Sequence, residues 1–123
     1  MNPRPSHKEL SNKIRAAKEL LETDSINILE PHVILADSLS LGYSFKLEFQ
    51  AIIEQLLDAV SPADYAGSRP SQRSYETEIK GAELFAFVVQ CALLDNQNVY
   101  FKFALYQDVL VVVSLHEDQK QEG

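Results

Sequence analysis

The strongest constraint on the fold is a run of alternating side chains near the C-terminal end, residues 98–118. Apolar and more polar residues alternate there one by one: Val99, Phe101, Phe103 and Leu105 against Tyr100, Lys102, Ala104 and Tyr106. A repeat of two residues is typical of a β-strand with one buried face. A second apolar run follows a polar break at Gln107-Asp108, so we expect two antiparallel strands joined by a short turn.

The length of that turn determines which side chains meet across the two strands. A turn of two residues pairs Tyr106 with Val109 and leaves His116 on the apolar face. A turn of three residues pairs Tyr106 with Leu110 and gathers the apolar residues on one face: Phe101, Phe103, Leu105, Val111, Val113 and Leu115. Because a slip of one residue moves every side chain to the other face, the pattern predicts the three-residue turn.

In the predicted register, polar side chains share the other face of the hairpin. Tyr100 lies opposite His116, and Lys102 lies opposite Ser114. Tyrosine and histidine can transfer protons, and lysine can neutralise a negative charge. From the residues alone, the group is either a functional cluster or the solvated face of an ordinary sheet.

The first part of the sequence predicts helices. Ser6 and Glu9 have the spacing of a capping box, and apolar residues recur after them at three- and four-residue spacing. This pattern predicts a helix over residues 6–22. We expect a second helix over residues 31–41, because proline is favoured in the first turn of a helix and Gly42 is well placed to end it.

A third helix is expected to begin at Ser44, and it carries the broadest apolar stripe of the sequence: Phe49, Ile52, Ile53, Leu56, Leu57 and Val60. Residues 61–64 predict a short helical turn, and residues 67–74 predict a polar loop. The alternating segment 75–79 and the continuously apolar segment 84–94 predict strands.

This order of elements predicts an α+β domain. The N-terminal helices are expected to pack on one face of a small antiparallel sheet formed by the C-terminal half. The 123 residues fit a single domain that spans 1–123, with ends at 1–5 and 118–123 expected to be frayed.

The charge, the apolar segments and the single cysteine of the sequence limit the functions that this protein can have. A net charge of −7 argues against a broad nucleic-acid-binding surface, although Arg69, Arg73 and Lys102 leave a local basic site open. No segment approaches the ~18 apolar residues of a membrane span, and residues 1–10 lack the apolar core of a signal peptide. We therefore expect a cytoplasmic protein that does not bind membranes. The single cysteine, Cys91, lies in an apolar run that predicts a buried, unreactive thiol.

Known metal and cofactor motifs are missing from the sequence. His7, His32 and His116 lie far apart, without the ligand spacing of a zinc site. The sequence contains neither a glycine-rich phosphate loop nor a G-x-S-x-G element. We therefore expect no metal and no cofactor, and any chemistry would be proton transfer and charge stabilisation by side chains.

Four stretches, taken in order, resemble the MqsR-type toxins of bacterial toxin–antitoxin systems, which belong to the RelE-like ribonuclease superfamily. They are HKELSNKIRAAKELL, VILADSLSLGYSF, IIEQLLDAVSPADYAGS and NVYFKFALYQDVLVVVSLHED. The last stretch is the most specific, because it combines Tyr-x-Lys on one strand with Ser-x-His-Glu on the next.

The resemblance implies a RelE-like domain that cleaves messenger RNA without a metal ion and is neutralised by a cognate antitoxin; a homodimer stays open. Such cleavage uses the ribose 2′-hydroxyl as nucleophile, with a base, an acid and a cation on the phosphate. By position, the resemblance implies Tyr100 and His116 as catalytic residues and Lys102 as a phosphate ligand. Arg69 or Arg73 would replace a cation that the family has elsewhere.

The sequence departs from the family pattern at several positions. Ala66-Gly67 stand where the family has a functional lysine, and Ala86 or Phe87 stands where it has a functional glutamine. One residue is added before Ser114, in agreement with the longer turn predicted above. Because of these departures, a second interpretation is a RelE-like protein-binding module with weakened or lost catalysis.

Overall fold

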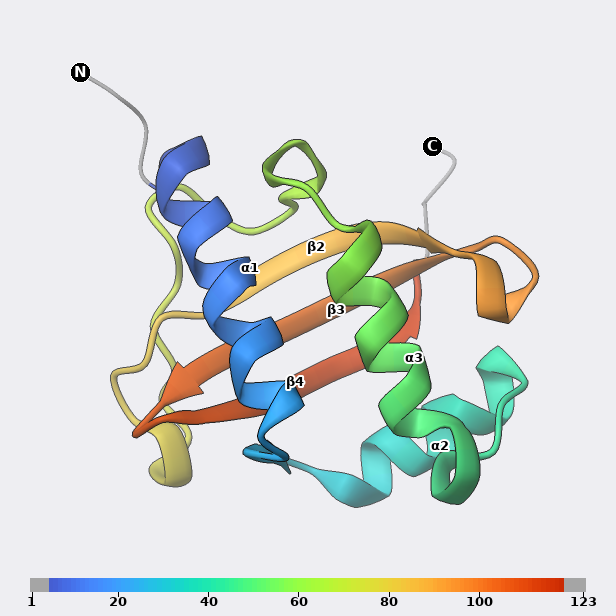
Figure 1. Ribbon diagram of the computed structural model, residues 1–123. Helices are drawn as coiled ribbons and strands as arrows, with labels where there is room; N and C mark the ends of the chain where they lie inside the picture. Colours follow the sequence, from blue (N-terminus) through green and yellow to red (C-terminus); the bar gives the residue numbers. More distant parts are fainter. Residues whose placement is uncertain (1–4, 119–123) are drawn as a thin grey trace, which may run out of the picture.

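In a computed structural model that describes residues 5–118, three α-helices and four strands form two layers (Figure 1). The elements, in chain order, are α1 (His7–Glu22), β1 (Ile26–Ile28), α2 (Pro31–Leu41), α3 (Phe45–Ala59), β2 (Phe85–Cys91), β3 (Gln97–Tyr106) and β4 (Val109–Glu117). In Figure 1, α1 and α3 cross the front of the sheet. Helices come first and most strands follow, so the predicted α+β fold class is confirmed.

The helix ends lie where the sequence predicts them. The Ser6 hydroxyl accepts a hydrogen bond from the Glu9 amide at 3.2 Å, and the Glu9 carboxylate accepts one from the Ser6 amide at 3.4 Å. Helix α2 ends at Gly42, whose φ of 88° is left-handed and suits glycine. Helix α3 is capped by the Ser44 hydroxyl, which accepts from the Leu47 amide at 3.3 Å. Local capping therefore defines these helices.

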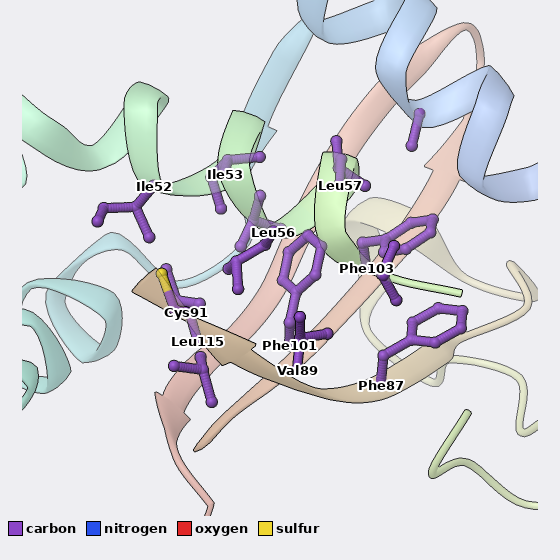
Figure 2. Packing of buried hydrophobic residues seen from close by; sticks show 14 of the residues in the cluster. Ile52, Ile53, Leu56, Leu57, Phe87, Val89, Cys91, Phe101, Phe103 and Leu115 are labelled. Atoms are coloured by element: carbon purple, nitrogen blue, oxygen red, sulfur yellow. The ribbon is translucent and has the colours of Figure 1, made fainter. Parts of the chain in front are cut away.

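The core lies between the three helices and the inner face of the sheet (Figure 2). Leu56 and Leu57 of α3 are fully buried there, next to aromatic rings of the strands. The ring centroid of Phe103 lies 5.9 Å from that of Phe87 and 5.4 Å from that of Phe101. The predicted stripe of α3 is thus confirmed as core, and the helices pack on one face of the sheet as predicted.

The sheet has the strand order β1-β4-β3-β2, and its pairing is mixed. Strands β2, β3 and β4 pair in antiparallel fashion as predicted, whereas β1 pairs in parallel with β4. The sequence analysis did not predict β1. The Leu110 amide donates to the Ser25 carbonyl at 2.8 Å, and the Leu29 amide donates to the Val112 carbonyl at 3.0 Å. These bonds come from a distant strand, and three residues are too few for a visible period.

The turn between β3 and β4 differs from the prediction. Tyr106 pairs with Val109, so the turn contains two residues, Gln107 and Asp108. Their φ angles are 51° and 59°, and a type I′ turn requires positive φ at both central positions. The predicted three-residue turn and the pairing of Tyr106 with Leu110 were therefore wrong.

A β-bulge in β4 restores the predicted pairing farther along the hairpin. The register shifts between Lys102 and Phe103, which pair with Ser114 and Val112. Val113 is the extra residue, so two residues of β4 oppose one of β3. The predicted pairing of Lys102 with Ser114 is confirmed, although the added residue lies in the bulge and not in the turn.

The bulge also changes which residues of β4 enter the core. Leu110, Val112 and Leu115 are fully buried and belong to the main core. Val111 and Val113 were predicted on this face, but they belong to a smaller cluster on the opposite side of the sheet. The reason is that the bulge takes up one residue, and every residue before it keeps the alternation set by the shorter turn.

Segment 75–79 is not a strand as predicted. It contains a short 3₁₀ helix, Thr77–Ile79, and Ile79 is buried in the smaller cluster together with Ala104 and Val111. Tertiary contact with the sheet outweighs the alternating pattern here. Strand β2 covers only part of segment 84–94, since residues 92–94 form another 3₁₀ turn.

Cys91 is buried as predicted, with a side-chain environment that limits its reactivity. It exposes 1% of its surface, and its thiol donates a hydrogen bond to the Gln55 side-chain carbonyl at 2.9 Å. Burial raises the pKa of the Cys91 thiol, which keeps it protonated and unreactive at neutral pH.

At the ends, residues 1–4 and 119–123 of the predicted frayed segments lie outside the described residues. Pro5 is buried, and its carbonyl accepts a hydrogen bond from the Arg69 guanidinium at 2.6 Å. Within residues 5–118, no helix has the length and apolar character needed to cross a membrane.

A substitution in the α3 stripe tests the core. Leu56→Ala should lower the free energy of unfolding by ~2–5 kcal/mol, because Leu56 is fully buried and its removal leaves a cavity. Chemical denaturation measures this change. Leu47→Ala, at an 82% exposed position of the same helix, is the control and should change stability by less than ~0.5 kcal/mol. Equal losses for the two variants would contradict this packing.

A second substitution tests a buried polar group. The Tyr43 hydroxyl is buried and has no hydrogen-bond partner among the described residues. An unpaired buried hydroxyl costs folding free energy, so Tyr43→Phe should raise the free energy of unfolding by ~1 kcal/mol at neutral pH. A loss of stability in a urea titration would mean that the hydroxyl has a partner.

The pKa of the Tyr43 hydroxyl predicts that the free energy of unfolding depends on pH. Burial, with a smaller contribution from the Asp37 carboxylate, raises the pKa of Tyr43 to about 12. An unfolded tyrosine titrates near ~10, so the folded state retains the proton at higher pH. The resulting stabilisation is complete below pH ~10 and is lost as the pH rises through about 12. Over that interval, wild-type protein should lose more stability than Tyr43→Phe.

Candidate functional site

The face of the sheet opposite the helices carries the predicted catalytic pair; we call Val88, Tyr100, Lys102, Ser114 and His116 on this side the open face. Tyr100 pairs with His116 across β3 and β4, as predicted. Their ring centroids are 5.0 Å apart and the rings are inclined by 13°, so they stack. Both side chains are partly exposed, and they can therefore meet a ligand in solution.

The hydrogen bond made by the His116 ring determines which of its two nitrogens carries the proton. Nδ1 lies 2.8 Å from the backbone carbonyl oxygen of Glu117. Because a carbonyl oxygen only accepts, Nδ1 carries the proton in this hydrogen bond. In the neutral ring, the lone pair is then on Nε2, which is the atom able to act as a base.

The Tyr100 hydroxyl, in contrast, is a proton donor. Burial raises the pKa of the Tyr100 hydroxyl, and the nearby Asp118 carboxylate raises it further. The phenol therefore stays protonated at neutral pH and acts as a hydrogen-bond donor. A ring nitrogen that can accept a proton and a hydroxyl that can donate one thus belong to two stacked side chains on the open face.

The structure brings two of the three predicted cations together. Lys102 Nζ lies 5.9 Å from the centroid of the Tyr100 ring. Lys102 also lines a pocket of about 330 Å³ together with Arg73, whose guanidinium donates to the Gly81 carbonyl at 2.8 Å. Arg69 lies apart from this pocket: its guanidinium carbon is 4.9 Å from the centroid of the Tyr65 ring, and it holds the Pro5 carbonyl.

Tyr65 leaves no room for a side chain at Gly67, which is one of the two positions where the resemblance implies a lysine. A Cβ atom at Gly67 would lie 2.6 Å from the Tyr65 hydroxyl oxygen, which is too close. That hydroxyl donates to the Ser68 carbonyl at 2.6 Å, and the ring meets Phe87 edge-on at 5.7 Å between centroids. A side chain at residue 67 would therefore displace Tyr65.

Tyr65 also belongs to the electrostatic surroundings of the open face. Burial raises the pKa of Tyr65; the Arg69 cation lowers it less strongly, and Glu83 and Tyr100 raise it further. The sequence analysis did not single out Tyr65 as a functional residue. The sequence does hold a signal for its placement: Tyr65 is followed by the small residues Ala66 and Gly67, and a glycine leaves room for the tyrosine ring.

The described residues contain no group of three or more His, Cys, Asp or Glu side chains able to hold a metal ion. The polar side chains of the open face are those of Tyr100, Lys102, Ser114 and His116. This set can exchange a proton and bind an anion.

A pair of substitutions tests the contact between Tyr65 and residue 67. Gly67→Ala should lower the free energy of unfolding by ~1 kcal/mol, because the new methyl group displaces the Tyr65 ring and breaks its hydrogen bond to Ser68. In a Tyr65→Ala background the same change should cost nothing. A double-mutant cycle by denaturation measures this coupling, and strictly additive effects would disprove the contact.

No protein-family model matches the chain, and no curated protein matches it. The resemblance to the MqsR-type toxins is therefore an inference from the four sequence stretches alone.

Proposed function

We propose that this protein is an endoribonuclease of the MqsR type, which cleaves single-stranded messenger RNA and is neutralised by a cognate antitoxin. The observation that carries the proposal is the stacked pair of Tyr100 and His116, which is partly exposed on the sheet face opposite the main core. Lys102 lies beside the pair and supplies a positive charge. These side chains match the needs of RNA cleavage: a base, an acid and a phosphate ligand.

In the proposed reaction, His116 Nε2 takes the proton from a ribose 2′-hydroxyl, because Nδ1 is engaged with the Glu117 carbonyl. The 2′-oxygen attacks the adjacent phosphorus, and the bond from phosphorus to the 5′-oxygen breaks. Tyr100 gives its proton to that leaving oxygen, since its raised pKa keeps the hydroxyl protonated. The products are a 2′,3′-cyclic phosphate and a 5′-hydroxyl.

Lys102 is the phosphate ligand in this reaction. Its ammonium group would lie next to the phosphate and stabilise the negative charge that develops during attack. Arg73 lines the same pocket and adds a second positive charge, whereas Arg69 is held by Tyr65 and Pro5. Glu30 and Glu76 line that pocket as well and balance its charge, so the phosphate ligand in this proposal is Lys102 itself.

A second candidate function is a protein-binding module with the same fold. Two observations favour it: Ala66-Gly67 stand where the resemblance implies a lysine, and α2 presents apolar side chains to solvent. Leu35 and Leu39, one helical turn apart, expose 50% and 79% of their surface. An apolar helix face of this kind is typical of a protein interface.

The decisive test compares purified variants on a single-stranded RNA in the presence of a metal chelator. Wild-type protein should cleave the RNA, and His116→Ala should be ~10²-fold slower or more, because it lacks the base. His32→Ala removes an exposed histidine of α2 and is the matched control, with unchanged cleavage. If wild type and His116→Ala both leave the RNA intact, the protein-binding module becomes the better assignment.

The role of Lys102 is tested by the salt dependence of RNA binding. Lys102→Ala should weaken binding and reduce the slope of log affinity against log salt by ~0.7, the value for one phosphate contact on a single strand. Lys46→Ala, at an exposed position of α3, should leave both quantities unchanged. Equal slopes for wild type and Lys102→Ala would exclude a phosphate contact.

A further inference from the structure

A pocket of about 330 Å³ adjoins the open face, and the proposed cleavage mechanism uses only Lys102 and Arg73 of its lining. Lys102, Val113 and Ser114 form its floor on β3 and β4. Residues 72–76 form one wall, and residues 29, 30 and 33, around the start of α2, also line it. The bulge places Val113 and Ser114 together in this pocket, although the two residues are consecutive.

The lining combines apolar surface with one strongly exposed aromatic ring. The apolar part consists of Leu29, Val33, Leu84 and Val113. Tyr75 lines the same pocket and exposes 88% of its surface. A tyrosine ring this exposed is available for stacking with a flat ligand, and stacking on tyrosine is a common way for proteins to hold unpaired bases.

The charges in the pocket distinguish a base from a phosphate. Glu30 and Glu76 line it together with Arg73 and Lys102. Carboxylates repel a phosphate, but they accept hydrogen bonds from the exocyclic amino groups of adenine, cytosine or guanine. Uracil has no such group. The lining therefore fits a neutral base with an amino group, whose phosphate lies toward Lys102.

We propose that this pocket binds one amino-bearing base of single-stranded RNA, stacked on Tyr75 and read by Glu30 and Glu76. The proposal rests on the proposed function for the identity of the ligand as RNA, and it gives that function a sequence preference. The bound base belongs to a nucleotide next to the cleaved bond, because Lys102 and Ser114 connect the pocket to Tyr100 and His116. The pocket volume fits the lower end of the ~300–1,000 Å³ typical of small-ligand sites.

Binding and cleavage are separated by 2′-O-methyl oligonucleotides, which lack the nucleophilic hydroxyl. Wild-type protein should bind an oligomer of cytosine or adenine more tightly than an oligomer of uracil. Tyr75→Ala should lose ~10-fold in affinity for the cytosine oligomer, and Tyr75→Phe should keep it, because the phenyl ring still stacks. Leu47→Ala, at an 82% exposed position of α3, is the control and should bind like wild type.

Two further variants report on the pocket directly. The sequence contains no tryptophan, so Tyr75→Trp adds a single indole whose fluorescence should be quenched by the cytosine oligomer. A double variant, Glu30→Gln with Glu76→Gln, should lose most of the preference for cytosine over uracil. Tyr75, Glu30 and Glu76 all lie in the pocket lining. Because the Tyr75 side chain is strongly exposed, its substitution should leave the denaturation midpoint unchanged.

The outcomes separate this proposal from the proposed function. Binding that depends on Tyr75 without cleavage of unmodified RNA supports the pocket and refutes the nuclease. Cleavage with equal KM and base preference in wild type and Tyr75→Ala overturns the pocket and leaves the nuclease. Failure of wild type to bind any of the oligomers overturns the pocket as well.

Discussion

The extra residue at Val113 determines what each face of the hairpin carries. A type I′ turn at Gln107-Asp108 sets the alternation for the first part of β4, and the bulge then shifts it by one residue. As a result Val112 and Leu115 both enter the core, and His116 reaches the open face. Without the shift, His116 would face the core and a leucine would face solvent. The apolar core and the stacked pair of the candidate site thus depend on the same local irregularity.

The segments that cover the two faces of the sheet determine where a ligand can reach it. Three helices bury one face, and Ile79 and its neighbours cover the hairpin end of the other face. Tyr100 and His116 remain accessible at the opposite end of that hairpin. The 72–76 segment and the start of α2 border the remaining pocket beside Lys102. Lys102 joins this pocket, whose other charges are Arg73, Glu30 and Glu76, to the pair of Tyr100 and His116.

Part of the candidate site could be predicted from the sequence. The pairs of Tyr100 with His116 and Lys102 with Ser114 were predicted from a three-residue turn, and they hold because the bulge supplies the one extra residue that the turn lacks. Arg69 and Arg73 were equivalent on sequence grounds, since both lie in one polar loop. Only the packed chain separates them, because Tyr65 holds Arg69 while Arg73 joins Lys102 in the pocket. Tyr75 was not predicted as a binding residue, because its exposure depends on that loop.

The sequence by itself determined the features that arise within a few neighbouring residues. These are the caps of α1 and α3, the glycine end of α2, the buried stripe of α3 and the apolar face of β3. Tertiary structure alone decided the parallel pairing of β1, the helical turn at Thr77–Ile79, the bulge in β4 and the pocket beside Lys102. The physical reason is the range of the interactions. Capping and periodic burial act between near neighbours, whereas strand pairing and the cover of a sheet face depend on hydrogen bonds and contacts between residues far apart in the sequence.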